Sequence, residues 1–269
     1  MAAQRTPRSL APWHAPAWRR VILGAGGLSA ALLCWQWYSG LSPDNVFVAS
    51  SPRRAWDTLA GMLSQGSFWT VQVSATLEGL AAGWACAVLG GLALGAVMGA
   101  SRHWREALEP LVFAVNCVPR LALIPVITLW LGYGFVYKAV VVAVAGFFPV
   151  LLNTMDGVRG ADPQLVQMSR SFGASRREQL RTVALPGALP IVFAGLRQSL
   201  AHSVVGAIGA EIWASSAGLG WLIANAEQNV RTDQVIAAIV VVTVIGAVLN
   251  ELLARAETRC LRWHRSWSG

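Results

Sequence analysis

Long apolar blocks separated by short polar loops are the strongest constraint on how this chain can fold. Of its 269 residues, 55% are hydrophobic and only 13% are charged, which is about half the charged share of a typical soluble domain. A helix needs about 20 predominantly apolar residues to cross the hydrocarbon core of a bilayer. The sequence therefore predicts an all-α membrane protein with several transmembrane helices.

Six blocks are long enough to be considered as spans: residues 21–38, 76–100, 111–131, 136–152, 188–210 and 234–253. The first block ends in Trp35, Trp37 and Tyr38, an aromatic cluster typical of a membrane interface. A cleaved signal peptide is the alternative for this block, but the apolar run is long and no clean small-residue cleavage site follows it. We therefore expect six transmembrane helices.

The basic residues predict the orientation of these spans. With both termini in the cytoplasm, the inner segments carry fifteen Lys and Arg residues and the outer segments carry four, among which is Lys138. The other two, Arg120 and Arg197, fall within spans. Because inner loops are enriched in Lys and Arg, this bias predicts cytoplasmic N- and C-termini and places residues 156–187 in the cytoplasm.

Several functions are excluded or disfavoured by the residues. Lys138 is the only lysine, so no Gly-Lys-Ser/Thr of a Walker A motif exists in the chain. The spacings of the four cysteines and four histidines suit neither a disulfide framework nor a metal site. The net charge of +8 is spread over short loops rather than along a basic stripe, so we expect no nucleic acid partner and attribute the charge to the anionic inner leaflet of the lipid bilayer.

The cytoplasmic segment has the sequence signals of two short helices joined by a corner. Asp162 and Pro163 are typical of a helix start, and Gly173 is typical of the left-handed position after a helix end. Ser175 and Glu178 match a capping box that starts the second helix. Leu165, Met168 and Phe172 share one face of the first helix. That apolar face must pack either against the protein's own helix ends or into a partner subunit.

The same segment carries a family resemblance. Gly173 is followed by nine residues and then by Val183-Ala184-Leu185-Pro186, which resembles the signature E-A-A-x3-G-x9-I-x-L-P of inner-membrane permeases of binding-protein-dependent ABC importers. Gln167-Met168-Ser169 stands where that signature has Glu-Ala-Ala. Four blocks of the sequence resemble the nitrate/sulfonate/taurine branch of these permeases: RLALIPVITLWLGYG (120–134), GFFPVLLNTMDGVRGADP (146–163), FGASRREQLRTVALPGALP (172–190) and AEIWASSAGLGWLI (210–223). The resemblance extends in order over residues 42–265.

The resemblance implies a six-span permease of the type I fold, located in the bacterial inner membrane and working as a homodimer. It implies two cytoplasmic ATP-binding subunits and a periplasmic solute-binding protein as partners, with no cofactor and no catalytic residue in this chain, which is not an enzyme. An aliphatic sulfonate is the expected substrate, with nitrate or taurine next. The expected ATPase-coupling residues are Leu165, Met168, Phe172, Gly173, Ser175, Leu185 and Pro186.

These expectations divide the chain into five parts: a cytoplasmic tail (1–20), a first transmembrane helix (21–40), a periplasmic segment (41–75), a permease core with five spans and a coupling loop at 156–187 (76–254), and a basic cytoplasmic tail (255–269). In the core, Gly91-x-x-x-Gly95-x-x-x-Gly99 is the spacing that lets two membrane helices approach closely.

Four residues are candidates for the translocation pathway: Pro119, Arg120, Pro125 and Glu211. Prolines within a span free backbone carbonyls, and an ionisable residue inside a membrane is a candidate functional residue. Arg120 could attract an anion; alternatively it reaches the inner face, or its span starts later. Glu211 could shape an outer gate beside the Gly218-Leu219-Gly220 turn, or it could be a solvated acid.

Two other classes of membrane protein agree less well with the sequence. An ion-driven secondary transporter usually shows inverted repeats and acidic residues at mid-membrane, and this sequence shows neither. An intramembrane enzyme would need a motif such as His-Glu-x-x-His, which is absent. The sequence therefore favours an ABC importer permease.

Overall fold

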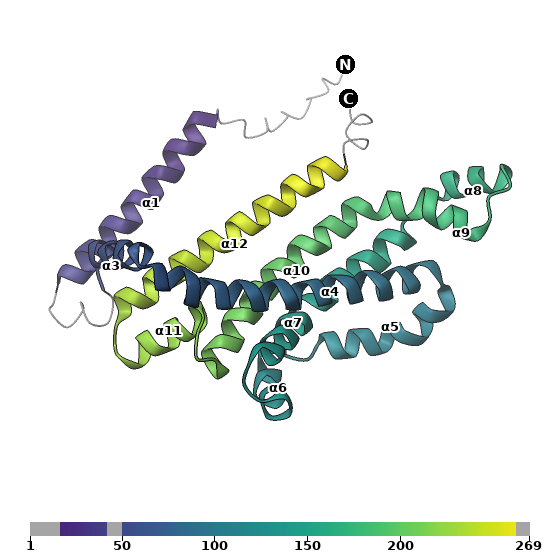
Figure 1. Ribbon diagram of the computed structural model, residues 1–269. Coiled ribbons are helices and arrows are strands. Elements are labelled where there is room, and N and C mark those ends of the chain that lie inside the picture. The colour runs from purple at the N-terminus through teal and green to yellow at the C-terminus, as the bar shows by residue number, and fades with distance from the viewer. Residues whose placement is uncertain (1–16, 42–49, 262–269) are drawn as a thin grey trace, which may run out of the picture.

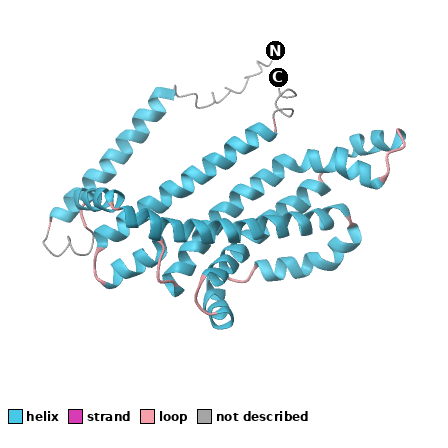
Figure 2. Cartoon of the chain, in the orientation of Figure 1, coloured by secondary structure: helices cyan, strands magenta, loops and turns pink. Residues whose placement is uncertain are grey.

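A computed structural model describes residues 17–41 and 50–261 of the chain, and every regular element in those ranges is a helix (Figures 1 and 2). The longer helices are α1 (Ala17–Gly40), α3 (Pro52–Ser64), α4 (Ser74–Ala100), α5 (Arg102–Asn116), α6 (Ile124–Leu131), α7 (Phe135–Arg159), α8 (Pro163–Ser171), α10 (Leu185–Ala214), α11 (Leu219–Gln228) and α12 (Thr232–Cys260). The four-residue helix α9 (Arg176–Gln179), the 3₁₀ turn η2 (Arg120–Leu123) and the π-helical segments η1 (Phe68–Val73) and η3 (Leu180–Ala184) complete the set.

Four of these helical stretches are long and apolar enough to cross a membrane: Phe68–Ala100, Phe135–Arg159, Arg176–Ala214 and Thr232–Cys260. The bent pair Arg102–Asn116 and Arg120–Leu131 would make a fifth span if it crosses as one unit. Helix α1 covers the expected first span but is not among these candidates. The prediction of an all-α membrane protein is therefore confirmed, whereas the count of six spans stays a prediction.

The bundle has two distinct ends (Figure 1). Helices α4 and α7 end, and α10 begins, near α8 and α9; we call this the α8–α9 end. Helices α4 and α12 begin, and α10 ends, near α3 and α11; we call this the α11 end. At the α11 end the Thr58 hydroxyl on α3 donates a hydrogen bond of 2.6 Å to the Asp233 carboxylate on α12. The expected terminal tails lie largely outside the described residues, as do residues 42–49 of the segment expected to be periplasmic.

Helices α4 and α7 form the centre of the bundle, and they approach closely because α4 presents glycines to α7. A Cβ atom built on Gly95 would lie 2.6 Å from the Leu151 carbonyl oxygen, and one built on Gly91 would lie 2.7 Å from the Val150 Cβ atom. These distances are too short for a side chain, so only glycine fits there. The close helix approach predicted from the Gly-x-x-x-Gly spacing is confirmed.

The predicted third span, residues 111–131, is wrong as a single continuous helix. The structure breaks it after Asn116, and the two halves are bent by 83°. The first half ends before Pro119, because a proline lacks the N–H that would continue the ladder and disfavours helical geometry in the residue before it. Pro119 itself is extended (ψ 105°) ahead of η2. Pro125 lies in the first turn of α6, where a missing N–H costs little.

The second short helix expected after Gly173 is also not a separate element. Helix α9 runs through η3 into α10, so that Arg176–Ala214 is one helical stretch. Pro186 lies in the first turn of α10. In η3 the Leu185 N–H donates to the Leu180 carbonyl, five residues back, and this π-type bond lets the helix continue past the proline.

Candidate functional site

The turn between α8 and α9 is built by the local interactions that its sequence predicts. The Asp162 carboxylate accepts a hydrogen bond of 2.8 Å from the Gln164 N–H at the start of α8. Gly173 follows α8 with a φ of 81°, in the left-handed region that favours glycine. Ser175 and Glu178 then form the predicted capping box, in which each side chain accepts from the other residue's backbone N–H. The Ser175 hydroxyl and the Ser175 N–H each donate to the Glu178 carboxylate at 2.7 Å, and these two hydrogen bonds lower the pKa of the Glu178 carboxyl.

The apolar face of α8 is open to solvent within the single chain. Leu165 is 45% exposed, Met168 is 55% exposed and Phe172 is 84% exposed. The alternative in which this face packs against the protein's own helix ends is therefore wrong. Leu185, at the start of α10, is 37% exposed. An uncovered apolar face of this kind is typical of a surface that another molecule covers.

Arg120 lies in the break between α5 and α6 rather than inside a continuous span. Its guanidinium donates hydrogen bonds to the Asn116 Oδ1 atom at 2.6 Å and to the Ala145 carbonyl at 3.1 Å. The guanidinium carbon also lies 5.7 Å from the centre of the Phe148 ring, within the range of a cation–π interaction. Among the described residues no carboxylate pairs with this half-buried side chain, so its positive charge is oriented but not neutralised.

Glu211 is fully buried near the end of α10, and the expectation of a solvated acid is wrong. Its Oε1 atom accepts a hydrogen bond from the Lys138 ammonium at 2.7 Å. Its Oε2 atom accepts one from the Thr76 hydroxyl at 2.9 Å and one from the Gly220 N–H at 2.8 Å. The carboxylate thereby joins α4, α7, α10 and α11 at a single point.

The backbone before α11 is held against the same carboxylate. Gly218 has a φ of 122°, and a Cβ atom built on it would lie 2.3 Å from the Glu211 Cδ atom. The Leu219 N–H donates to the Thr76 hydroxyl oxygen at 2.9 Å, and the Gly218 N–H donates to the Gln72 side-chain oxygen at 2.8 Å. Together with the Gly220 N–H bond to Glu211, these contacts hold the Gly218-Leu219-Gly220 turn in place.

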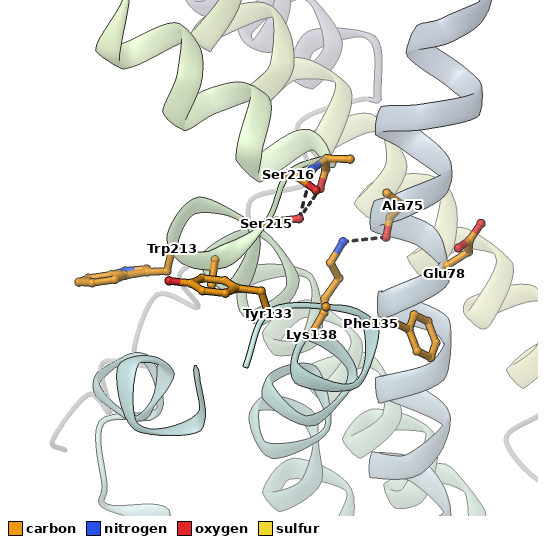
Figure 3. Close-up of a pocket in the computed structure, with 11 residues that line it drawn as sticks. Ala75, Glu78, Tyr133, Phe135, Lys138, Trp213, Ser215 and Ser216 are labelled. Atoms are coloured by element: carbon orange, nitrogen blue, oxygen red, sulfur yellow. Dashed lines mark hydrogen bonds between the residues drawn. The ribbon is translucent and has the colours of Figure 1, made fainter. Parts of the chain in front are cut away.

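Lys138 was expected in an outer loop, and this expectation is wrong. It lies in the first turn of α7 and is only 7% exposed. Besides Glu211, its ammonium donates to the Ala75 carbonyl at 3.0 Å (Figure 3). A charged residue that opens a long apolar run is itself a signal of a buried role, and this signal could have identified Lys138 from the sequence.

A cavity of about 630 Å³ opens beside this ion pair. Lys138, Ser215, Ser216 and Ala217 line it. Trp213 and Tyr133 lie together to one side of Lys138 (Figure 3). Glu78 lies across α4 from them and directs its carboxylate away from Lys138 (Figure 3). The cavity therefore combines a buried cation with an exposed aromatic rim.

The structure gathers the predicted site residues into three separate places. The α8 residues with Gly173 and Ser175 lie at the α8–α9 end, and Leu185 and Pro186 follow on the same helical stretch. Pro119, Arg120 and Pro125 lie at the break between α5 and α6. Among the described residues, Glu211 shares no hydrogen-bond partner with Arg120, so no hydrogen bond links these two candidate pathway residues.

The sequence of this chain matches a known protein family and individual known proteins. Residues 87–260 match the family described as "Binding-protein-dependent transport system inner membrane component". The chain is 32% identical to the putative aliphatic sulfonates transport permease protein SsuC of Bacillus subtilis over 236 residues, covering 87% of this chain and 85% of that protein. It is 31% identical to the taurine transport system permease protein TauC of Escherichia coli over 257 residues, covering 94% and 93%.

A solved structure also shares the fold. The MetNI methionine ABC transporter in an inward-facing conformation contains a chain that superimposes with a TM-score of 0.58 at 19% sequence identity. The match covers 74% of this chain and 98% of that chain. The architecture described above is therefore one that a known transporter uses.

Proposed function

Because this chain belongs to the family of inner membrane components of binding-protein-dependent transport systems, we propose that it carries a small organic anion across the bacterial inner membrane as the permease subunit of an ABC importer. In this role it works as a homodimer with two cytoplasmic ATP-binding subunits and a periplasmic solute-binding protein. It is a transport protein and not an enzyme; the partner subunits hydrolyse ATP.

The observation that carries the proposal is the exposed apolar face of α8. Three large side chains, Leu165, Met168 and Phe172, are exposed together on a short helix whose start and end are fixed by Asp162 and Gly173. A rigid helix with an uncovered apolar face is suited to insertion into a hydrophobic groove of another protein. We assign this groove to the ATP-binding subunit, because the chain has no Walker A motif of its own.

The coupling segment is connected directly to the membrane core. Helix α9, η3 and α10 form one helical stretch from Arg176 to Ala214. A displacement of α8 and α9 by the ATPase would therefore be transmitted through this stretch to α10. Leu185 and Pro186 lie in this stretch. Gly173, with its positive φ, is the point at which the coupling helix changes direction.

We place the α8–α9 end in the cytoplasm and count six spans. Helix α1 within residues 21–40 is the first, and the bent pair α5 and α6 is the third. This arrangement keeps residues 1–20, the coupling loop 156–187 and residues 255–269 on the inner side, with residues 41–75 outside and the permease core at 76–254. The excess of Lys and Arg on that side supports the orientation.

A path for an anion is supported by Arg120 and by the outward face of α10. Arg120 is held by neutral groups and pairs with no acid among the described residues, so its charge is available to a passing anion. Pro119 and Pro125 set the break in which it lies. Side chains of α10 at helical spacing stay exposed in the single chain, including Ile191, Gln198 and Val205, and in a homodimer this face would line the interface or the path. Glu211 would act on the path from its outer end.

We propose an aliphatic sulfonate as the substrate, with taurine and nitrate as the next candidates, since the relatives above are described as sulfonate and taurine permeases. A sulfonate and a nitrate are both oxyanions, which an arginine guanidinium can bind through two parallel hydrogen bonds. The alkyl chain of a sulfonate would suit the apolar side chains of α10.

Reconstitution tests the proposal. The chain is inserted into liposomes with its ATP-binding subunit and solute-binding protein, and uptake of labelled ethanesulfonate, taurine and nitrate is measured with and without ATP. We expect ATP-dependent uptake of ethanesulfonate and none from liposomes that lack the ATPase. Uptake driven by an ion gradient without the ATPase would contradict the transporter class. ATP-dependent uptake of nitrate or taurine alone would contradict only the substrate.

A further inference from the structure

A groove lined by arginines opens at the α8–α9 end, apart from the coupling face. It has a volume of about 960 Å³ and lies between the α4–α5 turn, the end of α7, and helices α8 and α9, all of which meet at one end of the bundle (Figure 1). Six arginines line it: Arg102, Arg105, Arg159, Arg170, Arg176 and Arg177. No aspartate or glutamate is among its lining residues.

Most of this positive charge has no counter-charge in the described part of the chain. Arg102 pairs with Glu106 at 2.5 Å on the surface of α5. Arg170 reaches only the neutral side chain of Gln179, at 3.4 Å. The other four arginines form no ion pair with a described residue. Such an arrangement attracts an anion that can contact several guanidinium groups.

The walls of the groove indicate that the anion has an apolar part. Between the arginines the surface is formed by apolar side chains, including Val158, Val166 and Leu180. Trp104 is 53% exposed in the first turn of α5, between Arg102 and Arg105. Exposed tryptophans beside basic residues are typical of the level of the lipid headgroups. With the α8–α9 end in the cytoplasm, as proposed above, this tryptophan would place the groove at the level of the phospholipid phosphates.

The groove and the coupling face use opposite sides of α8. Val166, Gln167 and Arg170 line the groove, whereas Leu165, Met168 and Phe172 form the exposed apolar face. At 100° per residue these two sets point in nearly opposite directions. An ATPase bound to the apolar face would therefore leave the groove side of α8 uncovered.

We infer that this groove binds the phosphate-bearing headgroup of an anionic phospholipid of the inner leaflet. Arginine is well suited to this ligand, because its planar guanidinium binds phosphate oxygens through two hydrogen bonds. A bound lipid would hold the coupling segment against the ends of α4 and α7. The inference rests on the proposed cytoplasmic location of the α8–α9 end, but it does not depend on which solute is transported.

Lipid retention by the full-length protein tests the inference. The purified protein in a neutral detergent is titrated with phosphatidylglycerol or phosphatidylcholine, and the bound lipid is counted by native mass spectrometry. We expect retained phosphatidylglycerol but not phosphatidylcholine, and we expect the retention to weaken as salt is raised. Glycerol phosphate and inorganic phosphate are added as competitors. If either displaces the lipid at equal concentration, the site binds a soluble phosphate and the lipid assignment is overturned.

Two matched double variants decide whether the groove is the site. Arg159→Gln/Arg177→Gln removes two groove arginines from α7 and α9, and Arg181→Gln/Arg259→Gln removes two exposed arginines that do not line the groove. We expect the groove variant to bind phosphatidylglycerol about thirtyfold more weakly, since each basic residue near an anionic headgroup contributes roughly fivefold. The control variant should bind it as the unmodified protein does.

Equal loss in both variants would overturn the inference, because the attraction would then be a general property of the basic inner face. A groove variant that keeps its lipid but no longer co-purifies with the ATP-binding subunit would overturn it as well, by assigning the groove to the protein partner. The count of bound lipid needs neither ATPase nor solute, so its result is independent of the uptake assay that tests the transport function.

Discussion

The ammonium of Lys138 lies 2.7 Å from the carboxylate of Glu211, although 73 positions separate the two residues in the chain. Both side chains are buried, and Glu211 also accepts hydrogen bonds from Thr76 and Gly220. The pair therefore joins α7 to α10, and the remaining bonds add α4 and α11. A buried charge without its partner is costly, so each member of the pair depends on the other.

Lys138→Met should lower the thermal stability of the purified protein more than Lys138→Met/Glu211→Gln. The single variant leaves a buried carboxylate without its cation, which costs about 3–5 kcal/mol. The double variant removes both charges, and the glutamine oxygen can still accept from Thr76 and Gly220. Thermal unfolding in detergent, followed by size-exclusion chromatography, measures which of the two variants is less stable. A double variant less stable than the single one would show that the two charges do not stabilise each other.

Gly95→Ala should destabilise the bundle by about 1–3 kcal/mol, as overpacked core positions do. The added Cβ atom would lie 2.6 Å from the Leu151 carbonyl oxygen, so α4 and α7 would have to separate. Gly246→Ala on α12 is the matched control, because nothing lies within 4 Å of its Cβ position. The same unfolding measurement should find this control unchanged or slightly more stable. Equal effects of both variants would contradict the role of close packing.

Local signals in the sequence predicted the turn between α8 and α9. Asp162, Gly173 and Ser175 act through neighbours within three residues, so their roles can be recognised without knowledge of the fold. The glycine spacing on α4 was equally informative, because a close helix contact needs small residues wherever the partner helix comes from.

Interactions between distant segments could not be predicted in this way. Lys138 and Glu211 each appeared at the edge of an apolar block, and nothing local indicates that the two edges meet. The break at Pro119 was predicted only as a perturbed span, since a proline marks where a helix ends but does not fix the angle to the next one. The continuity of α9 with α10 could not be predicted either, because it depends on the π-type bond between Leu185 and Leu180, which has no signal in the sequence.

The proposed orientation predicts from which side of the membrane a thiol reagent can reach each single cysteine. Arg54→Cys and Arg231→Cys, in a variant whose four native cysteines are replaced, should react with an impermeant thiol reagent added from the periplasm. Arg177→Cys should react only after the inner face is opened. All three positions are exposed in the structure, so a lack of reaction reports the membrane and not burial. Reaction of Arg177→Cys from the periplasm would contradict the topology and the coupling role together.

The turn between α8 and α9 depends on the backbone of Gly173. Its φ is 81°, and nothing lies within 4 Å of a Cβ atom built on it. A side chain at this position therefore meets no neighbouring atom, and its cost comes only from the left-handed backbone. That cost is of order 1–3 kcal/mol for a residue other than glycine, is smaller for asparagine and is greatest for a β-branched residue.

Gly173→Val should therefore leave the protein inserted and folded, but weaken its co-purification with the ATP-binding subunit and abolish ATP-dependent uptake. Relief of the strained φ would turn the face of Leu165, Met168 and Phe172 away from the groove that receives it. Gly173→Asn, which tolerates the same backbone, should retain most of both activities, and Ser175→Ala should lose only about 1 kcal/mol of local helix stability. Co-purification and uptake are measured for all three variants. If valine and asparagine at position 173 behave alike, the left-handed turn does not position the coupling helix.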